Sequence, residues 1–264
     1  MATTMTGPRT DGHDLLTGTF PQASQEQRVR QAIVAAVQAP SIHNTQPWQF
    51  RLRDDPRRVE LWADRSRQLP EADPRGRQLT ISCGAAAFNL GLQLQLVGLR
   101  ASFELLPEPD RPDLLAVITV AELADGGMSE PDRALAAANG QRRTVRSAFA
   151  DKPVDTSLLL DLVSAAEREG AECRLIGRPG EMAGVAHWTA AGQRVQDVDS
   201  RLRRELATWT RPEGALAPDG VVAAAFGRDS AANHEARFPQ RDFAMGRPVA
   251  NIPGAAADEA VQLL

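Results

Sequence analysis

The stretch that decides the fold is LTISCGAAAFNLGLQLQLVG, residues 79–98. It is apolar on most sides, which is the pattern of a helix buried in the centre of a domain. The small residues Gly84, Ala85, Ala86 and Gly91 permit the close approach of neighbouring elements. The stretch therefore predicts a central helix against which the rest of the domain packs.

Alternation of apolar and polar residues predicts a strand pair on each side of this helix. WQFRL (48–52) and RVELW (58–62) precede it, and ASFEL (101–105) and LLAVITV (114–120) follow it. An earlier helix is predicted from the capping box of Ser24 and Gln27 to Ala39, because Pro40 disfavours its continuation. The order helix, hairpin, helix, hairpin, which ends at Gly127, predicts an α+β fold.

The second half is predicted to hold more helix than strand. Ser129-Glu130-Pro131 marks the start of a short helix, and Asp155 can cap another that Gly170 ends. Residues 173–176 predict a strand, and a long helix is expected from about Pro179 to Trp209. We expect residues 1–23 to form a loosely held arm and residues 211–253, rich in Gly, Pro and Ala, to form a lid.

Composition excludes several functional classes. The 264 residues include 30 basic and 34 acidic side chains, so a nucleic-acid or anionic-membrane partner is not expected. No apolar run reaches membrane-spanning length and the N-terminus has no signal-peptide pattern, which predicts a cytoplasmic protein.

Cys83 and Cys173 show no paired spacing, so we expect reduced thiols and no metal site. The absence of GxGxxG, GxxxxGK[ST] and GxSxG disfavours Rossmann dehydrogenases, P-loop enzymes and α/β-hydrolases.

One candidate site is the loop APSIHNTQPW, residues 39–48. It places four uncharged hydrogen-bonding side chains and a histidine between two prolines, a stiff frame without formal charge. Such a frame suits a planar heteroaromatic ligand, because each buried ring nitrogen or carbonyl needs a hydrogen-bond partner. The alternative is an ordinary helix-to-strand loop whose polar side chains satisfy its own backbone.

The other candidate is the run RRTVR, residues 142–146. Three guanidinium groups and a hydroxyl within five residues match the geometry of a phosphate monoester. The alternative is a solvated basic run on the surface.

Taken together, APSIHNTQPWQF and RRTVRSAF resemble the two hallmark motifs of the nitroreductase family, and their arrangement is similar to its mycobacterial Acg-type members. The resemblance implies a nitroreductase-like FMN-binding fold. The motifs stand here in inverted order, which implies two fused pseudo-repeats, each with a mixed antiparallel sheet flanked by helices, that share one FMN site. The halves would be residues 24–127 and 128–264, the second being short at its C-terminal end. The implied cofactor-binding residues are Pro40, Ser41, His43, Asn44 and Gln46 near the ring, and Arg142, Arg143, Thr144 and Arg146 near the phosphate.

The resemblance further implies an oxidoreductase that passes electrons from NAD(P)H through FMN to a nitroaromatic, a quinone or a similar small-molecule acceptor. No side chain is assigned as a catalytic acid or base, because the cofactor carries the chemistry. His43 lies where the family varies, so packing is an equal alternative for it. The resembled proteins continue past the position of Leu264 into a further helix-strand unit. Two expectations follow: the flavin site is incomplete in this chain, or a homodimer forms in which the partner subunit fills the gap. Two alternatives remain open: a flavin-sequestering protein with a lid over the FMN, and a subunit that neither binds flavin nor catalyses.

Overall fold

The protein is described by a computed structural model over residues 23–53, 55, 57–124, 127–144, 152–211 and 217–222. The first part of the chain forms α1 (Gln25–Ala36), η2 (Ile42–Asn44), β1 (Trp48–Leu52), β2 (Arg58–Ala63), η3 (Arg65–Arg67), α2 (Arg77–Leu96), β3 (Leu99–Leu105) and β4 (Leu114–Glu122). The second forms α3 (Glu130–Ala138), α4 (Thr156–Arg168), α5 (Pro179–Val198), α6 (Ser200–Thr208), β5 (Thr210–Arg211) and β6 (Val221–Val222).

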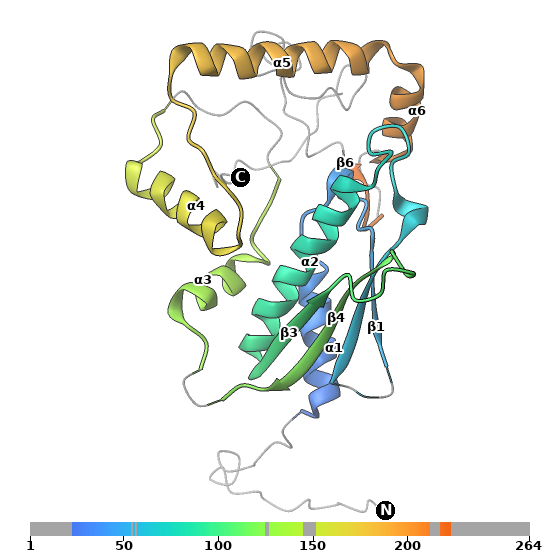
Figure 1. Ribbon diagram of the computed structural model, residues 1–264, viewed down its shortest axis with the longest axis vertical. Helices are drawn as coiled ribbons and strands as arrows, with labels where there is room; N and C mark the ends of the chain where they lie inside the picture. The colour runs from blue at the N-terminus through green and yellow to red at the C-terminus, as the bar shows by residue number, and fades with distance from the viewer. Residues whose placement is uncertain are drawn as a thin grey trace, which may run out of the picture.

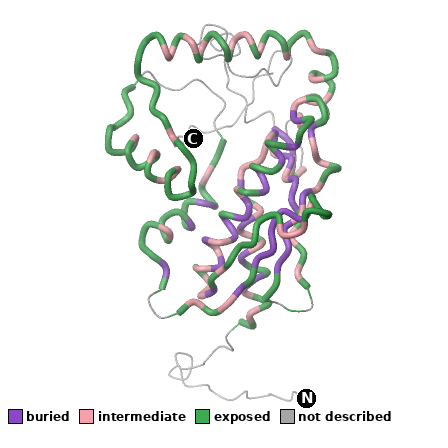
Figure 2. The backbone as a smooth tube through the Cα atoms, in the orientation of Figure 1, coloured by how far each residue is buried: buried purple, intermediate pink, exposed green. Residues whose placement is uncertain are grey.

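The first part is a two-layer α+β unit (Figure 1). Its four strands are all antiparallel and lie in the order β1-β2-β4-β3, so both predicted hairpins form and β2 joins them by pairing with β4. Helix α2 contacts three of the strands, and α1 packs along α2. Figure 2 shows the buried positions concentrated on these two helices and the sheet. The predicted order of elements in residues 24–127 is confirmed.

The central helix buries most of its circumference but leaves one stripe exposed, which includes Ile81 and Phe88, so it is less enclosed than its sequence predicts. Cys83, Ala86, Leu90 and Leu94 are completely enclosed. The helix ends where Gly98 adopts a φ of 76°, a conformation that costs glycine little. The backbone N–H of Gly98 donates to the carbonyl of Gln95 at 3.0 Å, which satisfies part of the helix end.

The second part has a different character. Helix α3 packs on α2 through a small cluster that contains Leu92, Met128 and Ala136, whereas α4, α5 and α6 contain no buried residue. The predicted caps Ser129 and Asp155 are present. Within residues 128–144, 152–211 and 217–222 the only strand pairing is the short parallel pair β5-β6, so the expected second antiparallel sheet is not seen there.

Two predicted elements need correction. Residues 173–176 form no strand: the described part of the chain places no strand beside them, and Leu175 and Ile176 remain about half exposed. The long helix starts at Pro179 as predicted but stops at Val198, where Asp199 takes an extended conformation and caps α6 instead. The spacing of apolar residues within a segment does not report whether a strand has a neighbour to pair with. It also does not report that the helix breaks after Val198.

Other expectations fall largely outside the described residues. The N-terminal arm lies there apart from residue 23, and so does most of the predicted lid, of which residues 211 and 217–222 are described.

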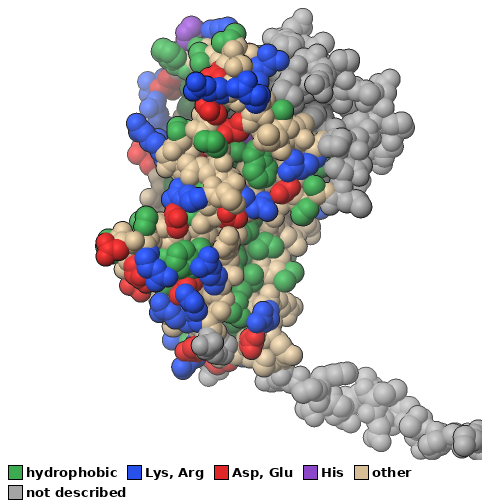
Figure 3. Space-filling view, turned by 90° about the vertical axis from the view of Figure 1, so that its right-hand side faces the viewer, with side chains coloured by type: hydrophobic (Ala, Val, Ile, Leu, Met, Phe, Trp, Pro, Cys, Tyr) green, Lys and Arg blue, Asp and Glu red, His purple; other side chains and the backbone are tan. Residues whose placement is uncertain are grey.

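Over the described ranges, no helix has the length and apolar character needed to cross a membrane. The face shown in Figure 3 carries arginine and carboxylate side chains interspersed with one another.

Candidate functional site

The first predicted site, residues 40–47, is called the polar loop from here on, and its own hydrogen bonds fix its shape. The hydroxyl of Ser41 accepts from the backbone N–H of Gln46 at 2.9 Å, which closes the loop. The N–H of Ile42 donates to the hydroxyl of Ser82 on α2 at 3.1 Å. Ser82 in turn donates to the carbonyl of Gln78 at 2.7 Å. The central helix therefore sets the position of the loop.

The backbone of the polar loop is strained. His43, Asn44 and Gln46 adopt φ values of 47°, 54° and 50°, a left-handed region that non-glycine residues seldom occupy. Residues held in this region cost free energy and cluster at ligand-binding and switch sites. His43 is buried within the loop, with 6% of its surface exposed. This burial favours the packing alternative for His43, and its contact with a cofactor stays a prediction.

The second predicted site follows α3, and two asparagines hold it beside α1. The amide of Asn89 on α2 donates to the Asn139 side-chain oxygen at 2.6 Å, and Asn139 donates to the carbonyl of Ala35 at 2.8 Å. Arg142 adds a bond of 3.3 Å to the carbonyl of Gln38. These donors satisfy carbonyls at the C-terminal end of α1. They bring the arginines next to the polar loop, which is separated from the end of α1 by three residues.

One cavity of about 770 Å³ joins the two predicted sites. The predicted residues that line it are Pro40, Ser41 and Asn44 from the polar loop and Arg142, Arg143 and Thr144 from the basic run. Its size lies within the range of roughly 300–1,000 Å³ that is usual for small-molecule sites. Six of the nine predicted residues thus surround one space, although they come from segments about 100 positions apart. Arg146 lies outside the described residues.

The charge distribution of this cavity favours an anion. Burial, together with the positive charge of Arg143, lowers the pKa of the Arg142 guanidinium. The Nε of Arg142 is buried, and the described residues offer it no hydrogen-bond partner. Arg142 also donates to the hydroxyl of Thr144 at 3.2 Å, which brings a third polar group to the cluster. An acceptor-rich anion such as a phosphate would satisfy the orphaned donor and offset the repulsion between the guanidinium groups.

Residues 217–222, which we call the clamp segment, cover part of the polar loop. The Asn44 amide donates to the carbonyls of Pro218 and Gly220 at 3.3 and 3.0 Å, and the Gln46 amide also donates to Pro218. The N–H of Gly220 returns a bond of 3.0 Å to the Asn44 carbonyl. Gln46 therefore faces the clamp segment, while Asn44 bonds to it and still lines the cavity.

Asp219 anchors the clamp segment through two arginines. Its carboxylate accepts from Arg67 and from Arg211, each at 2.9 Å. The bonds to Arg211 and Arg67 hold the pKa of Asp219 below its usual value. Arg67 also donates to the carbonyl of Thr45 in the polar loop at 2.9 Å. The carboxylate of Asp219 thus connects the clamp segment to β5 through Arg211 and to the polar loop through Arg67.

Several of these positioning residues were not predicted from the sequence. Asn89 had a visible signal, since it is an amide within an otherwise apolar helix, and buried amides need partners. Asn139 was assigned only to the end of a helix. Arg67 and Asp219 are 152 positions apart, and no local pattern pairs them.

Curated relatives align with most of this chain. The "Putative NAD(P)H nitroreductase Rv3131" of Mycobacterium tuberculosis is 35% identical over 206 residues, 77% of this chain and 56% of the relative. The "Putative NAD(P)H nitroreductase acg" of the same species is 30% identical over 213 residues, 76% of this chain and 62% of the relative. The chain therefore spans little more than half the length of the curated relatives it matches.

Comparison with solved structures finds partial matches. A nitroreductase family protein from Streptococcus pneumoniae TIGR4 covers 42% of this chain and 86% of its own, with 21% identity and a TM-score of 0.34. A putative nitroreductase in complex with FMN from Desulfovibrio desulfuricans covers 52% and 90%, with 23% identity and a TM-score of 0.32. No protein-family profile matches the chain. By its sequence, the chain is a homologue of the mycobacterial proteins named putative NAD(P)H nitroreductases.

Proposed function

We propose that the chain binds FMN and acts as an oxidoreductase, passing electrons from NAD(P)H through the flavin to a nitroaromatic, a quinone or a similar acceptor. One observation carries the proposal: the polar loop and the arginine run, which are far apart in the sequence, line a single cavity. The names of the curated relatives support the same reading.

The donor set of the cavity fits the two ends of FMN. Arg142, Arg143 and Thr144 would hold the phosphate, because the buried Nε of Arg142 lacks a partner and its guanidinium lies beside a second positive charge. Pro40, Ser41 and Asn44 would border the ring, where neutral groups match its nitrogens and carbonyls. We keep Gln46 and Arg146 as candidate contacts, and His43 as a residue that packs behind them.

When bound, FMN supplies the hydride acceptor and donor of the reaction. The chain's own residues would bind the cofactor and orient it. The hydroxyl of Ser41 fixes the loop that would face the ring, and α2 holds that loop in place. The arginines neutralise the phosphate and restrict it to one end of the cavity. No residue of this site is assigned a proton-transfer role.

We also propose that residues 24–127 and 128–264 are the two halves of a nitroreductase-like pair that share one site, and that two chains associate. Support for the shared site comes from the motif order, with the loop in one half and the arginines in the other. Support for association comes from apolar side chains on the second half, including Leu160 and Trp188, which are 60% and 73% exposed.

The clamp segment favours a second candidate function, a flavin-sequestering protein with little turnover. Asn44 and Gln46, both predicted to face the ring, bond to Pro218 and Gly220 instead. A segment held over the polar loop would limit the access of NAD(P)H and acceptor to a bound flavin. The two candidates share the cofactor and differ in turnover.

Two measurements on the purified protein test these functions. The absorbance of the supernatant after heat denaturation reports bound flavin, and NAD(P)H oxidation with menadione or nitrofurazone reports turnover. The reductase proposal predicts both signals. Flavin without turnover would favour sequestration, and a colourless protein that takes up no added FMN would overturn both candidates.

A further inference from the structure

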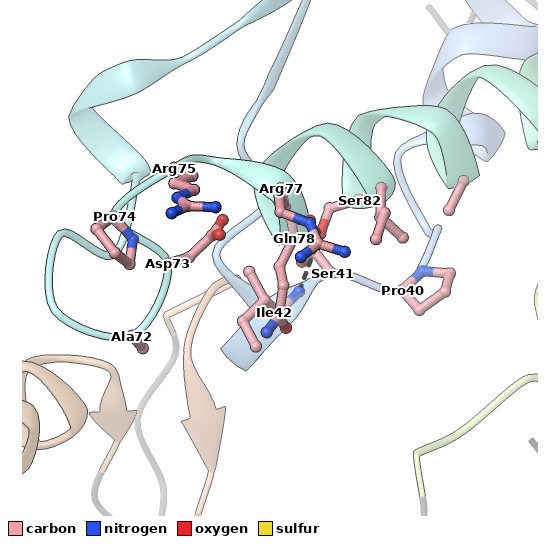
Figure 4. Close-up of a pocket in the computed structure, with 12 residues that line it drawn as sticks. Pro40, Ser41, Ile42, Ala72, Asp73, Pro74, Arg75, Arg77, Gln78 and Ser82 are labelled. Atoms are coloured by element: carbon pink, nitrogen blue, oxygen red, sulfur yellow. Dashed lines mark hydrogen bonds between the residues drawn. The ribbon is translucent and has the colours of Figure 1, made fainter. Parts of the chain in front are cut away.

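A second cavity, of about 720 Å³, lies next to the proposed cofactor cavity. Pro40 and Ser41 line both, so the two spaces meet at the start of the polar loop. The far wall of the second cavity is the first half of α2 and the residues just before it (Figure 4). A ligand there would therefore lie beside whatever ring the polar loop holds.

The second cavity has an apolar wall. Ile42 of the polar loop and Ile81 and Ala85 of α2 contribute to it, together with Pro74. Ile81 is 69% exposed, although it lies on the helix that forms the core. An exposed apolar wall of this kind suits the flat face of an aromatic ring.

Two arginines that form no ion pair with the described residues give the second cavity its charge. Arg75 and Arg77 both line it, and over the described residues neither guanidinium takes part in an ion pair. Most other arginines of residues 24–124 are paired, for example Arg28 with Glu122 and Arg65 with Asp113.

One carboxylate, that of Asp73, also lines the second cavity and faces the same space (Figure 4). It is 95% enclosed, and it accepts a hydrogen bond of 2.9 Å from the backbone N–H of Leu79, near the start of α2. Its charge therefore serves the helix end as well as the cavity. With two guanidinium groups against one carboxylate, the lining keeps a net positive charge.

We propose that this cavity binds an aromatic co-substrate that carries an anionic group, with Arg75 and Arg77 bound to its phosphate or carboxylate oxygens. The inference rests on the proposed function, because it assigns the second cavity to the partner that exchanges electrons with the flavin. Guanidinium groups suit this task, since they present paired N–H donors that match both kinds of oxyanion. The apolar wall would orient the ring, and the arginines would favour ligands whose ring carries a negatively charged group.

The anionic group has two sources, and calorimetry separates them. ADP-ribose carries the pyrophosphate of the electron donor without its reactive ring, and 4-nitrobenzoate carries the carboxylate of an acceptor. 4-Nitrobenzamide is the uncharged counterpart of the second probe. Each is titrated into the native protein, into R75Q/R77Q, and into R100Q/R203Q, which removes two exposed arginines elsewhere.

We expect R75Q/R77Q to lose at least tenfold in affinity for one of the two anionic probes, with 4-nitrobenzamide changed less than twofold. The control pair should bind like the native protein, and R75K/R77K should recover part of the loss. Loss for ADP-ribose assigns the site to the donor, and loss for 4-nitrobenzoate assigns it to the acceptor. A native protein that binds neither anion, or a variant that binds both as the native does, would overturn the proposal. Flavin content is measured on the same samples, so absent FMN with an intact anion effect counts only against the proposed function.

Discussion

At the scale of single residues, the proposed cofactor site depends on side chains that make no predicted contact with a ligand. Asn139 links Asn89 of α2 to the Ala35 carbonyl at the end of α1. This link fixes the position of the chain from which the arginine run starts at Arg142. Buried amides of this kind are costly to leave unsatisfied. The sequence marks the arginines as interesting, but only the folded chain shows why they lie at the polar loop.

Replacing Asn139 by Ala should destabilise the protein by about 1–3 kcal/mol, because it leaves the buried Asn89 amide without its acceptor. Urea unfolding followed by circular dichroism measures the change. Because the two residues share one hydrogen bond, the double variant N89A/N139A should cost less than the sum of the single variants. Strict additivity, or a cost for N139A below about 0.5 kcal/mol, would show that the link contributes little.

The two cysteines should differ sharply in reactivity. Burial raises the pKa of the Cys83 thiol to about 12, so at pH 8 it stays protonated as well as enclosed. Cys173 is only partly buried. Ellman's reagent should therefore titrate one thiol per native chain and two in guanidinium chloride. Rapid modification of both thiols in the native protein, or survival of the fast thiol in C173S, would contradict this assignment.

At the scale of elements, local signals predicted most of the first part of the chain. The Ser24–Gln27 capping box, the two hairpins and the central helix all form. These signals work because each is local: a cap, a turn or a periodic pattern decides one element by itself. Residues 173–176 show the limit, because a strand needs a neighbour and no pattern within the segment reports whether one is present.

The clamp segment should respond clearly to a single substitution, because one carboxylate anchors it. The D219N variant removes the charge that binds Arg67 and Arg211, so deuterium exchange at residues 217–222 and in the polar loop should rise several-fold. D113N breaks a comparable pair with the exposed Arg65 and should leave exchange there unchanged. Equal exchange in D219N and the native protein would mean that the backbone bonds of Gly220 suffice to hold the segment.

The clamp segment should also loosen in acid, and the direction follows from the pKa of Asp219. Arg211 and Arg67 hold this pKa below its value in the unfolded chain, about 3.9. The carboxylate therefore stabilises the folded segment at pH above that value and loses this contribution as pH falls through its lower folded pKa. The protection factors of the amides in residues 217–222, which are corrected for the intrinsic pH dependence of exchange, should fall below about pH 4 in the native protein, while in D219N this fall should be absent. The same acid response in both proteins would assign it to other carboxylates.

At the scale of the whole molecule, burial is divided unevenly. The extensive core belongs to residues 24–124, whereas α4, α5 and α6 contain no buried residue and expose large apolar side chains. The shared cavity was predictable only because both motifs were known in combination. Their inverted order says that the two parts of the site come from different halves, but it does not say how the halves pack.

The exposed apolar faces should bring two chains together. Sedimentation equilibrium at micromolar concentration should give a dimer, and L160E/W188E should raise its dissociation constant at least tenfold, because both side chains project 60% or more of their surface. E167Q/R168Q alters exposed polar residues on α4 and should leave the dissociation constant unchanged. A native protein that remains monomeric would contradict the expectation.

FMN titration of flavin-free protein, followed by quenching of flavin fluorescence, tests the central claim that one cavity joins the polar loop and the arginine run. The account predicts one FMN per chain and a loss of at least tenfold in FMN affinity for R142Q/R143Q, since each charge-assisted bond contributes about 1.5–3 kcal/mol. Riboflavin, which lacks the phosphate, should bind the native protein and the variant with equal affinity. An R142Q/R143Q protein that binds FMN as tightly as the native chain, or a native chain that binds none, would contradict it.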